Sequence, residues 1–507
     1  MRKVGFDSEK YLAEQTKAIL DRVAKFDHRL YLEFGGKLLL DYHAARVLPG
    51  YDPTVKIKLL QALKENIEIV ICIYAKDIES GRLRGDFGMT YDMACLKTID
   101  DLKDWDLEVN KVVITRFKNE ALAIKFKNRL ERKGIKVYIH REIKGYPEGI
   151  DKIVSARGYG RNDYIKSDKP IVVITAPGPG SGKLATCLSQ LYHDHKKGIN
   201  SGYAKFETFP IWNLPLKHPV NVAYESATAD IGDYNLVDPF HLKAYNKKAI
   251  NYNRDVDAFP ILKSILQKIV GRGKKMLMYN SPTDMGVNRV GFGIVDDEEV
   301  KRASKQEIIR RYFRYNWEYM LGAERKETIE RAKELMKEVG VKETDRACVS
   351  AARLAAEAAA KVPSKGKNGI FCGAAIELAE GEIITGKNSP LMHAASAAII
   401  NAAKHLAGVP DKMHLLPRNV INNIAALKKE ILGAKSESLD LEETLVALSI
   451  SAATNPAAEG AVKTLKSLRD CEMHMTNMPT RGDEAGLRKL KINFTCDAQP
   501  ASHYFLR

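Results

Sequence analysis

The chain has 507 residues, of which 45% are hydrophobic and 28% charged, a composition typical of a soluble globular protein with two to four domains. No apolar run approaches the roughly 18 residues of a membrane span, and no apolar signal core follows the first residues, so we expect a cytoplasmic protein with no membrane partner. The formal net charge of +16 favours an anionic partner; because the basic residues are dispersed and no nucleic-acid-binding motif is present, we expect a small anionic or phosphorylated ligand, with a merely solvated basic surface as the alternative.

Strands and helices alternate through the first 300 residues. An amphipathic helix is predicted at residues 8–26, and a helix at 120–133 ends at Gly134. Strands are predicted at 30–34, 68–74, 111–117, 135–140, 171–175 and 202–208. This alternation indicates βαβ units in a mostly parallel, Rossmann-like or P-loop-like α/β sheet. In such a sheet, ligands bind at the carboxyl ends of the strands.

Helices dominate the segment that follows. Two charged helices are predicted between residues 301 and 340, and alanine-rich helices at 346–362 and 391–408. Because alanine allows helices to approach closely, we expect these two to pack between subunits of a homo-oligomer. The predicted domains are an N-terminal α/β region (1–165), a phosphate-binding region sharing its sheet (166–300), a helical region (301–363) and a C-terminal α/β subdomain (364–507).

The strongest local signal is the segment IVVITAPGPGSGK at 171–183, in which a buried strand runs through a glycine-rich turn into a helix. Glycines let backbone amides converge on an anion, and the helix N-terminus adds the positive end of its dipole. The residues expected to hold phosphate groups are Gly178, Gly180, Ser181, Gly182 and Lys183. A glycine turn needed only for tight packing of strand and helix is the alternative.

This glycine loop departs twice from the standard pattern G-x-x-x-x-G-K-[ST]. Pro177 replaces the first glycine, and Leu184 replaces the hydroxyl residue that normally ligates magnesium. Thr186 is the nearest hydroxyl that could act instead. We therefore expect ATP or another nucleotide with Mg²⁺ as the cofactor, and the sequence does not identify the metal ligands.

Polar residues farther along supply candidates for catalysis. We interpret residues 217–257 as long polar loops, which often carry function. Within them, Asp230 and Asp238 are candidates for a metal ligand or base, and His241 for an acid or base. The strand predicted after the glycine-loop helix ends in Lys205, Glu207 and Thr208, which are candidate substrate contacts. Capping, turn and solvated surface roles are the alternatives for each.

A second glycine turn, LEFGGK at 32–37, precedes three further catalytic candidates. These are Asp41, His43 and Arg46, of which Arg46 can clamp a carboxylate or phosphate bidentately. A tight turn beside a surface helix is the alternative. Polar turns at 84–88 and 281–286 are expected at the same edge of the sheet.

Residues 369–408 resemble the core of the cytidine-deaminase fold, in which two short strands lead into a helix. Zinc-dependent deaminases carry H-A-E at the start of that helix and P-C-x-x-C later. Here the triplet is His393-Ala394-Ala395, and the seven cysteines include no C-x-x-C pair, so no zinc is expected. The fold also hosts a zinc-free, folate-dependent purine transformylase, which makes Lys387, Asn388 and His393 candidate ligand contacts. Fold likeness without chemistry is the alternative.

A set of segments spread over the chain resembles a bacterial family catalogued as domain of unknown function 1846. These segments are LEFGGK, DYHAARVLPG, RGDFG, APGPGSGK, KFETFPIWNLPLKHPVN, VDPFHL, NYNRDV and SPTDMGVN. The resemblance implies a bacterial, cytoplasmic α/β protein and transfers no established activity. Some members of the family bear the label ATP-dependent peptidase; residues 178–183 fit the first half of that label, and no motif fits the second.

Two classes of function follow from these signals. The first is an enzyme that acts on a small anionic metabolite by phosphoryl transfer or ATP-dependent ligation, where positioning and electrostatics supply most of the acceleration. The second is a non-catalytic, oligomeric ligand-binding or scaffold protein with a degenerate deaminase-like module.

Overall fold

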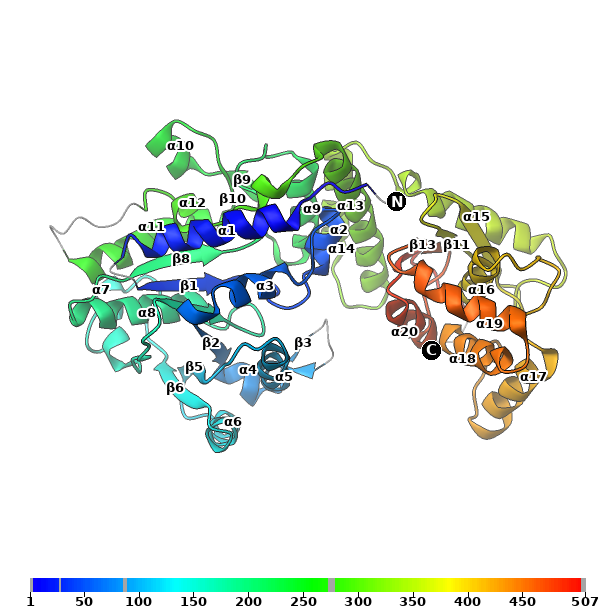
Figure 1. Ribbon diagram of the computed structural model, residues 1–507, viewed down its shortest axis with the longest axis horizontal. Coiled ribbons are helices and arrows are strands. Elements are labelled where there is room, and N and C mark those ends of the chain that lie inside the picture. Colours follow the sequence, from blue (N-terminus) through cyan, green and yellow to red (C-terminus); the bar gives the residue numbers. More distant parts are fainter. Residues whose placement is uncertain (1–2, 27–28, 85–88, 272–278, 503–507) are drawn as a thin grey trace. The chain divides into compact units, whose positions relative to one another are not determined.

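The structure, a computed structural model, describes residues 3–26, 29–84, 89–271 and 279–502 (Figure 1). The chain divides into two compact units. The N-terminal unit comprises Val4–Glu225 and Gly232–Ser304, and the C-terminal unit comprises Met1–Lys3, Ser226–Ile231 and Lys305–Arg507. Each unit has its own β-sheet covered by helices, so the mixed α/β class predicted from the sequence is confirmed. Among the helices in the described ranges, none combines the length and apolarity needed to cross a bilayer.

A six-stranded sheet forms the centre of the N-terminal unit, in the order β6-β5-β2-β7-β1-β8. All neighbouring strands are parallel, as the alternation of strands and helices predicted. The strands are continuous runs of buried apolar residues, the pattern of a parallel sheet covered on both faces. Their bounds are β1 Leu30–Phe34, β2 Ile67–Tyr74, β5 Lys111–Phe117, β6 Lys136–Arg141, β7 Ile171–Thr175 and β8 Gly202–Phe206.

Helices pack on this sheet in two groups (Figure 1). Helix α8 contacts β1, β7 and β8 and is backed by α11, whereas α4, α5 and α6 lie beside β2, β5 and β6. Two short two-stranded ribbons, β3–β4 and β9–β10, lie outside the main sheet. The bounds of these elements are α1 Ser8–Val23, α2 Tyr42–Val47, α3 Val55–Ala62, β3 Leu83–Arg84, α4 Ala75–Glu79, β4 Met89–Thr90, α5 Tyr91–Asp104, α6 Ala121–Arg132, α7 Ile150–Ile153, α8 Lys183–Lys196, β9 Asn235–Val237, α10 Pro239–Tyr245, β10 Ile250–Tyr252, α11 Asn253–Val270 and α12 Pro282–Met285.

The interpretation of residues 217–257 as long loops is wrong. The segment contains α9 (Pro219–Ala227), both strands of the β9–β10 ribbon, helix α10 and the start of α11. Its polar residues concealed this because several of them cap helices or pair the ribbon instead of facing solvent. Asp238, for example, caps α10 by accepting the backbone N–H groups of Phe240 and His241.

The C-terminal unit is built on a smaller, mixed sheet in the order β12-β11-β13-β14. Strand β11 is antiparallel to β12 and β13, and β13 is parallel to β14. The strands are β11 Gly373–Glu377, β12 Ile383–Lys387, β13 Glu472–Met475 and β14 Asn493–Cys496; the helices are α14 Lys326–Glu338, α15 Ala347–Ala360, α16 Ala394–Leu406, α17 Arg418–Ala426, α18 Leu441–Ala452, α19 Pro456–Thr464 and α20 Arg481–Lys489. Helix α13 (Asp297–Met320) runs through the division between the two units.

Alanine in α15 and α16 lets these helices lie directly on the small sheet. A Cβ added at Gly373 of β11 would come within 2.1 Å of the Ala352 carbonyl oxygen, and one at Gly386 of β12 within 2.1 Å of the Ala398 amide nitrogen. Such backbone contact requires small side chains on both partners. Packing inside the unit therefore accounts for the buried alanines of these two helices, while homo-oligomer formation stays a prediction.

Candidate functional site

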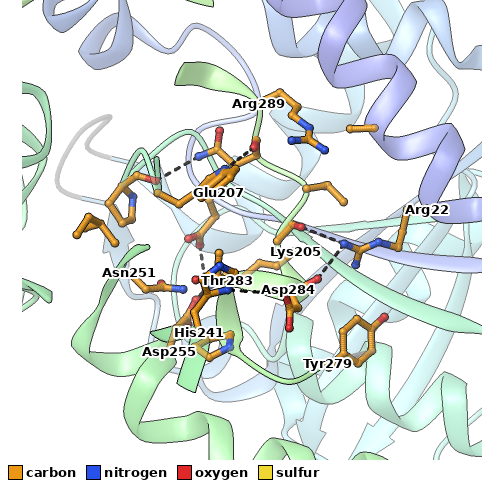
Figure 2. A pocket seen from close by; sticks show the side chains of 18 of the residues that line it. Arg22, Lys205, Glu207, His241, Asn251, Asp255, Tyr279, Thr283, Asp284 and Arg289 are labelled. Atoms are coloured by element: carbon orange, nitrogen blue, oxygen red, sulfur yellow. Dashed lines mark hydrogen bonds and ion pairs between the residues drawn. The ribbon is translucent and has the colours of Figure 1, made fainter. Parts of the chain in front are cut away.

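A cavity of about 600 Å³ lies beyond the edge strand β8 in the N-terminal unit (Figure 2). Its walls come from α1, the carboxyl end of β8, α10, the start of α11, and the segment from α12 to Arg289. The glycine loop does not contribute a lining residue. The volume is that of a pocket for a small metabolite, and it opens at the end of a parallel strand, where ligands of such sheets bind.

Lys205, Glu207 and Asp255 line this cavity, and the buried Tyr252 is bonded to them from behind the lining. Side chains two residues apart in an extended segment point to the same side, so Lys205 in β8 and Glu207 just beyond it face the cavity together. Tyr252 ends β10, and Asp255 lies in the first turn of α11. Lys205 also forms a parallel bridge with Gly286, which holds the 281–286 turn at this edge of the sheet, as expected from the sequence.

These four side chains form one polar network, which we call the Lys205 cluster. Lys205 Nζ donates to both carboxylate oxygens of Asp255, at 2.8 and 2.6 Å, and to the Tyr252 hydroxyl at 2.6 Å. It lies 3.2 Å from Glu207 Oε1. The Tyr252 hydroxyl in turn donates to Glu207 Oε2. One ammonium group thus balances two carboxylates, and the tyrosine connects the lysine to Glu207.

Burial and charge shift the pKa values within the Lys205 cluster. Burial, together with the neighbouring Asp255 carboxylate, raises the pKa of Glu207 above its ordinary value, although Lys205 opposes that shift. Burial alone would lower the pKa of Lys205, but Asp255 and Glu207 outweigh it and raise the pKa. Burial and the two carboxylates also raise the pKa of Tyr252. A carboxyl group with a raised pKa in a pocket is suited to transfer a proton near neutral pH.

Gly35 makes room for the Glu207 side chain. A Cβ built at Gly35 would lie 2.4 Å from Glu207 Cγ, and the Gly35 amide donates to the Phe206 carbonyl at 2.8 Å. The glycine turn at 32–37 therefore has a packing function at the carboxyl end of β1, where it lets Glu207 fold over the end of the neighbouring strand. No anion-binding role is needed to explain this glycine.

His241 and Asp238 lie on α10 at another wall of the cavity. His241 Nδ1 is 3.1 Å from Ser281 Oγ and 3.8 Å from Asp284 Oδ1, so the ring lines the pocket beside the N-terminus of α12. Asp238 is fully buried, and its Oδ2 accepts the Thr283 hydroxyl at 2.7 Å. Of these two candidates, His241 lines the cavity. Asp238 instead connects α10 to α12 through its hydrogen bonds.

Four cationic side chains line the cavity around the Lys205 cluster. They are Arg22, Lys25, Lys247 and Arg289. Arg22 is fixed, because its Nη2 donates to the carbonyl oxygens of Asp284 at 2.8 Å and Gly286 at 3.2 Å. Figure 2 shows this arginine reaching from α1 toward the turn that carries Asp284.

The glycine loop is well formed but lies apart from the cavity. Its carbonyls are engaged: Gly178 O accepts the Ser181 hydroxyl at 2.8 Å, and Ser181 O accepts the Thr115 hydroxyl at 2.7 Å. Gly180 and Gly182 both have left-handed backbone angles, with φ of +71° and +89°. Within the described ranges, the backbone amides of Gly178 and residues 180–183 donate no hydrogen bond to a protein acceptor. The first amides of a helix normally have no partner within the helix.

Lys183 and Thr186 both lie in the first turn of α8, on the side near Cys72. Lys183 is half-buried. Burial raises the pKa of the Cys72 thiol, and the positive charge of Lys183 opposes that rise. The Thr186 hydroxyl faces the sheet, where it lies 3.4 Å from Cys72 Sγ and 3.5 Å from His140 Nδ1. Its hydroxyl is thus taken up by contacts in the core.

The remaining candidates of the N-terminal half have structural partners. Asp41 caps α2 through the Ala44 amide and forms a buried ion pair of 2.8 Å with Lys56. His43 packs edge-on against Phe209, and Arg46 lies in the last turn of α2. Asp230 is in the short 3₁₀ segment Ala229–Ile231, which belongs to the C-terminal unit. The expected turn at 84–88 lies largely outside the described residues.

In the C-terminal unit, His393 is the N-cap of α16 and is bonded to a carboxylate. Its Nδ1 is 2.8 Å from Asp483 Oδ2, and Asp483 also accepts the Thr480 hydroxyl at 2.8 Å and the Leu441 amide at 3.0 Å. Asn388 uses its side chain to bond the backbone of Ile370 and Cys372, and Lys387 ends β12. The three bonds of Asp483 connect the N-termini of α16, α18 and α20. Among the described residues, no group of three or more His, Cys, Asp or Glu side chains is arranged to hold a metal ion.

Sequence reasoning singled out the strand end with Lys205 and Glu207, the ring of His241 and the turn at 281–286, and it missed most of the other residues of the cavity. Asp255 and Tyr252 stand in the segment NYNRDV, which was noted only as a family feature. Arg22 was placed on a helix with no role. A usable signal was the strand end Lys205-Phe206-Glu207, because two ionisable residues at i and i+2 beyond a buried strand point to the same cavity.

The matches of this chain to family models and to similar proteins agree with one another. The chain matches the model of "Domain of unknown function DUF1846, N-terminal" over residues 4–340 and that of its C-terminal part over residues 344–505. A UPF0371 protein of Clostridium botulinum (strain Alaska E43 / Type E3) is 57% identical over 496 residues, which cover 98% of this chain and 97% of the relative. A UPF0371 protein of Clostridium tetani (strain Massachusetts / E88) is 55% identical over 498 residues, with 98% of each chain covered.

Proposed function

We propose that this chain, which belongs to the DUF1846 family, is an enzyme that transfers a proton to or from a small anionic metabolite bound in the cavity beside β8. The observation that carries the proposal is the Lys205 cluster, in which a carboxyl group with a raised pKa lies at the floor of a metabolite-sized cavity. Glu207 is the acid or base, Lys205 and Tyr252 hold its hydrogen bonds, and Asp255 fixes Lys205.

The geometry of the cluster favours catalysis over a purely structural ion pair. A structural pair is most stable with matched charges, because an uncompensated buried carboxylate is costly. Here two carboxylates share a single lysine, so one of them readily takes up a proton. Tyr252 is held in place by stacking against Tyr224, whose ring centroid is 6.3 Å away. Because the Tyr252 hydroxyl bonds to Glu207, the fixed tyrosine also holds the Glu207 carboxyl group in position. A rigidly positioned carboxyl group meets the geometric requirement for general acid–base catalysis.

Phosphoryl transfer is the reaction class that agrees best with the residues lining this cavity and with the expectations from the sequence. In that reaction a carboxylate accepts the proton of an attacking hydroxyl, and cationic groups hold the transferred phosphoryl group. Glu207 would take the first role, and the cations around the cavity the second. ATP-dependent ligation, the other expected class, uses the same two elements.

Turnover of the Glu207→Gln variant tests the proposal. Wild-type protein and variant are incubated with phosphorylated metabolites, with and without ATP and Mg²⁺, and products are identified by mass spectrometry. Loss of a general acid or base lowers the rate about 10²–10⁴-fold. The Asp257→Asn variant, on the exposed face of α11, is the control for loss of one carboxylate, and it should keep most of the rate. A Glu207→Gln variant as active as wild type would refute the assignment.

Anion binding by the glycine loop is a second candidate function. It is supported by the backbone amides of Gly178 and residues 180–183, which donate to no acceptor within the described part of the chain. Two cations, Lys183 and Arg116, lie nearby, and the Arg116 guanidinium contacts the Gly180 carbonyl. The Lys183→Ala variant should then bind ATP at least tenfold more weakly, a change of about 1.4 kcal/mol. Unchanged affinity in a calorimetric titration would reject this role.

A further inference from the structure

We propose that Arg22 and Arg289 form an anion subsite that holds the phosphate monoester end of the ligand in the cavity beside β8. The inference rests on the proposed function for the location of the site, and it adds the chemical class of the ligand and the residues that select it. Both arginines are among the lining side chains (Figure 2).

Arg22 presents a hydrogen-bond donor that the protein leaves unused. Its Nη1 is buried and has no hydrogen-bond partner, whereas Nη2 is anchored on the carbonyls of Asp284 and Gly286. A buried donor without a partner costs about 1–3 kcal/mol, and more for a charged group. An oxyanion in the cavity would satisfy Nη1, and the two anchoring bonds hold the guanidinium in place before the ligand arrives.

The contacts that hold the two arginines on this wall of the cavity are made with neutral groups. Arg22 bonds to neutral carbonyls, and its Cζ lies 5.9 Å from the centre of the Tyr279 ring. The Arg289 guanidinium lies over Phe292, with Cζ 5.2 Å from the ring centre. Within the described part of the chain, the hydrogen bonds found for the Arg22 side chain go to backbone carbonyls, and the contact found for the Arg289 side chain is with Phe292. By contrast, Lys205 is balanced by Asp255 and Glu207.

The acidic residues around the cavity are already engaged or exposed. Asp284 Oδ2 accepts the Tyr245 hydroxyl at 2.9 Å and the amides of Asn280 and Ser281. Asp255 and Glu207 belong to the Lys205 cluster, and Asp21 is exposed. Among the described lining residues, the five cations Arg22, Lys25, Lys205, Lys247 and Arg289 outnumber the four carboxylates Asp21, Glu207, Asp255 and Asp284, so the cavity has an excess of positive charge. A phosphate dianion neutralises such an excess better than a carboxylate does, and arginine binds its oxygens bidentately.

The test is a calorimetric titration of the full chain with three probes: inorganic phosphate, glycerol phosphate and succinate. We expect saturable binding of the two phosphates with Kd below about 10 mM and weaker binding of succinate. Arg22→Gln and Arg289→Gln should each weaken phosphate binding tenfold or more. Because Arg22 also anchors the 284–286 turn, Arg289→Gln, which breaks no anchoring bond, provides the independent variant. Lys125→Gln, on the exposed face of α6, controls for the loss of one positive charge.

Three results would overturn the inference: no saturable binding of either phosphate to wild-type protein, tighter binding of succinate than of phosphate, or arginine variants that bind like Lys125→Gln. The Glu207→Gln variant separates this inference from the proposed function. It should keep phosphate affinity while losing turnover; a Glu207→Gln variant that keeps both refutes the catalytic proposal alone and leaves the anion subsite standing.

Discussion

Replacement of Lys205 by methionine should destabilise the N-terminal unit strongly at neutral pH. The substitution keeps the volume of the aliphatic side chain but removes the ammonium group that is bonded to Asp255 and Glu207. Lys205 is 18% exposed, Asp255 26% and Glu207 24%, so the carboxylates are mostly screened from water. Removal of one partner of a buried ion pair costs about 3–5 kcal/mol. For a unit of this size that corresponds to a fall in Tm of roughly 6–10 °C.

The loss should depend on pH in a defined direction. Burial already raises the pKa of Glu207 in the folded state, and without Lys205, which opposes that shift, it lies farther above the value of the unfolded chain. The folded state then binds more protons than the unfolded state, and stability falls as pH rises. The difference in Tm between wild type and Lys205→Met is therefore largest near pH 7–8 and shrinks toward pH 5, where the carboxyl groups take up protons.

Differential scanning calorimetry at pH 5 and pH 8 measures this difference, and a double mutant supplies the control. Asp255→Asn in the Lys205→Met background removes the carboxylate that accepts two bonds from the lysine, so it should restore at least half of the lost Tm. Equal destabilisation at both pH values, or a double mutant less stable than Lys205→Met alone, would show that charge balance does not hold the cluster together.

Three further predictions concern positions outside the cluster. Gly180→Ala should cost about 1 kcal/mol because its left-handed backbone strains any Cβ, and Gly182→Ala should lower Tm more, since its Cβ would also lie 3.1 Å from Thr115; the reverse order would contradict the loop geometry. Asp41→Asn should destabilise the N-terminal unit by about 3–5 kcal/mol in urea unfolding at pH 7, because Lys56, 1% exposed, loses its carboxylate; Asp52→Asn, at the more exposed pair with Lys58, is the control and should cost less than about 1 kcal/mol. Burial opposes the charged form of His393, but Asp483 outweighs it and raises the pKa of His393, so the stabilisation from this pair is present below the unfolded pKa and is lost as pH rises through the folded pKa; His393→Gln should therefore lower the Tm of the C-terminal unit more at pH 6 than at pH 9, and a larger effect at pH 9 would refute the assignment.

The sequence was a good guide to the elements and a partial guide to the site. Runs such as EIVICIY and IVVIT predicted the parallel strands, because strands buried on both faces read as continuous apolar segments. The end of the helix at Gly134 was also correct, since this glycine has a left-handed backbone angle. Residues 217–257 were misjudged because capping and ribbon residues are as polar as loop residues.

The cavity itself could not be derived from local patterns. Arg22 lies more than 260 residues from Asp284 and Gly286 in sequence, and their hydrogen bonds exist only in the folded chain. The glycine loop stood out because its motif is contiguous, whereas the Lys205 cluster combines β8 with β10 and α11. Gly35 illustrates the same limit: its place in a turn was evident, but its contact with Glu207 depends on the pairing of β1 with β8.

A crystal structure of the protein with a bound metabolite would decide where the ligand binds. The compound is chosen from a thermal-shift screen of phosphorylated metabolites, since a ligand that binds only the folded state raises Tm. We predict electron density in the cavity beside β8, with the phosphate group against Arg22 and Arg289 and a reacting atom within about 3 Å of Glu207. Density for the ligand at the glycine loop or in the C-terminal unit, with the cavity beside β8 filled only by water, would contradict this prediction.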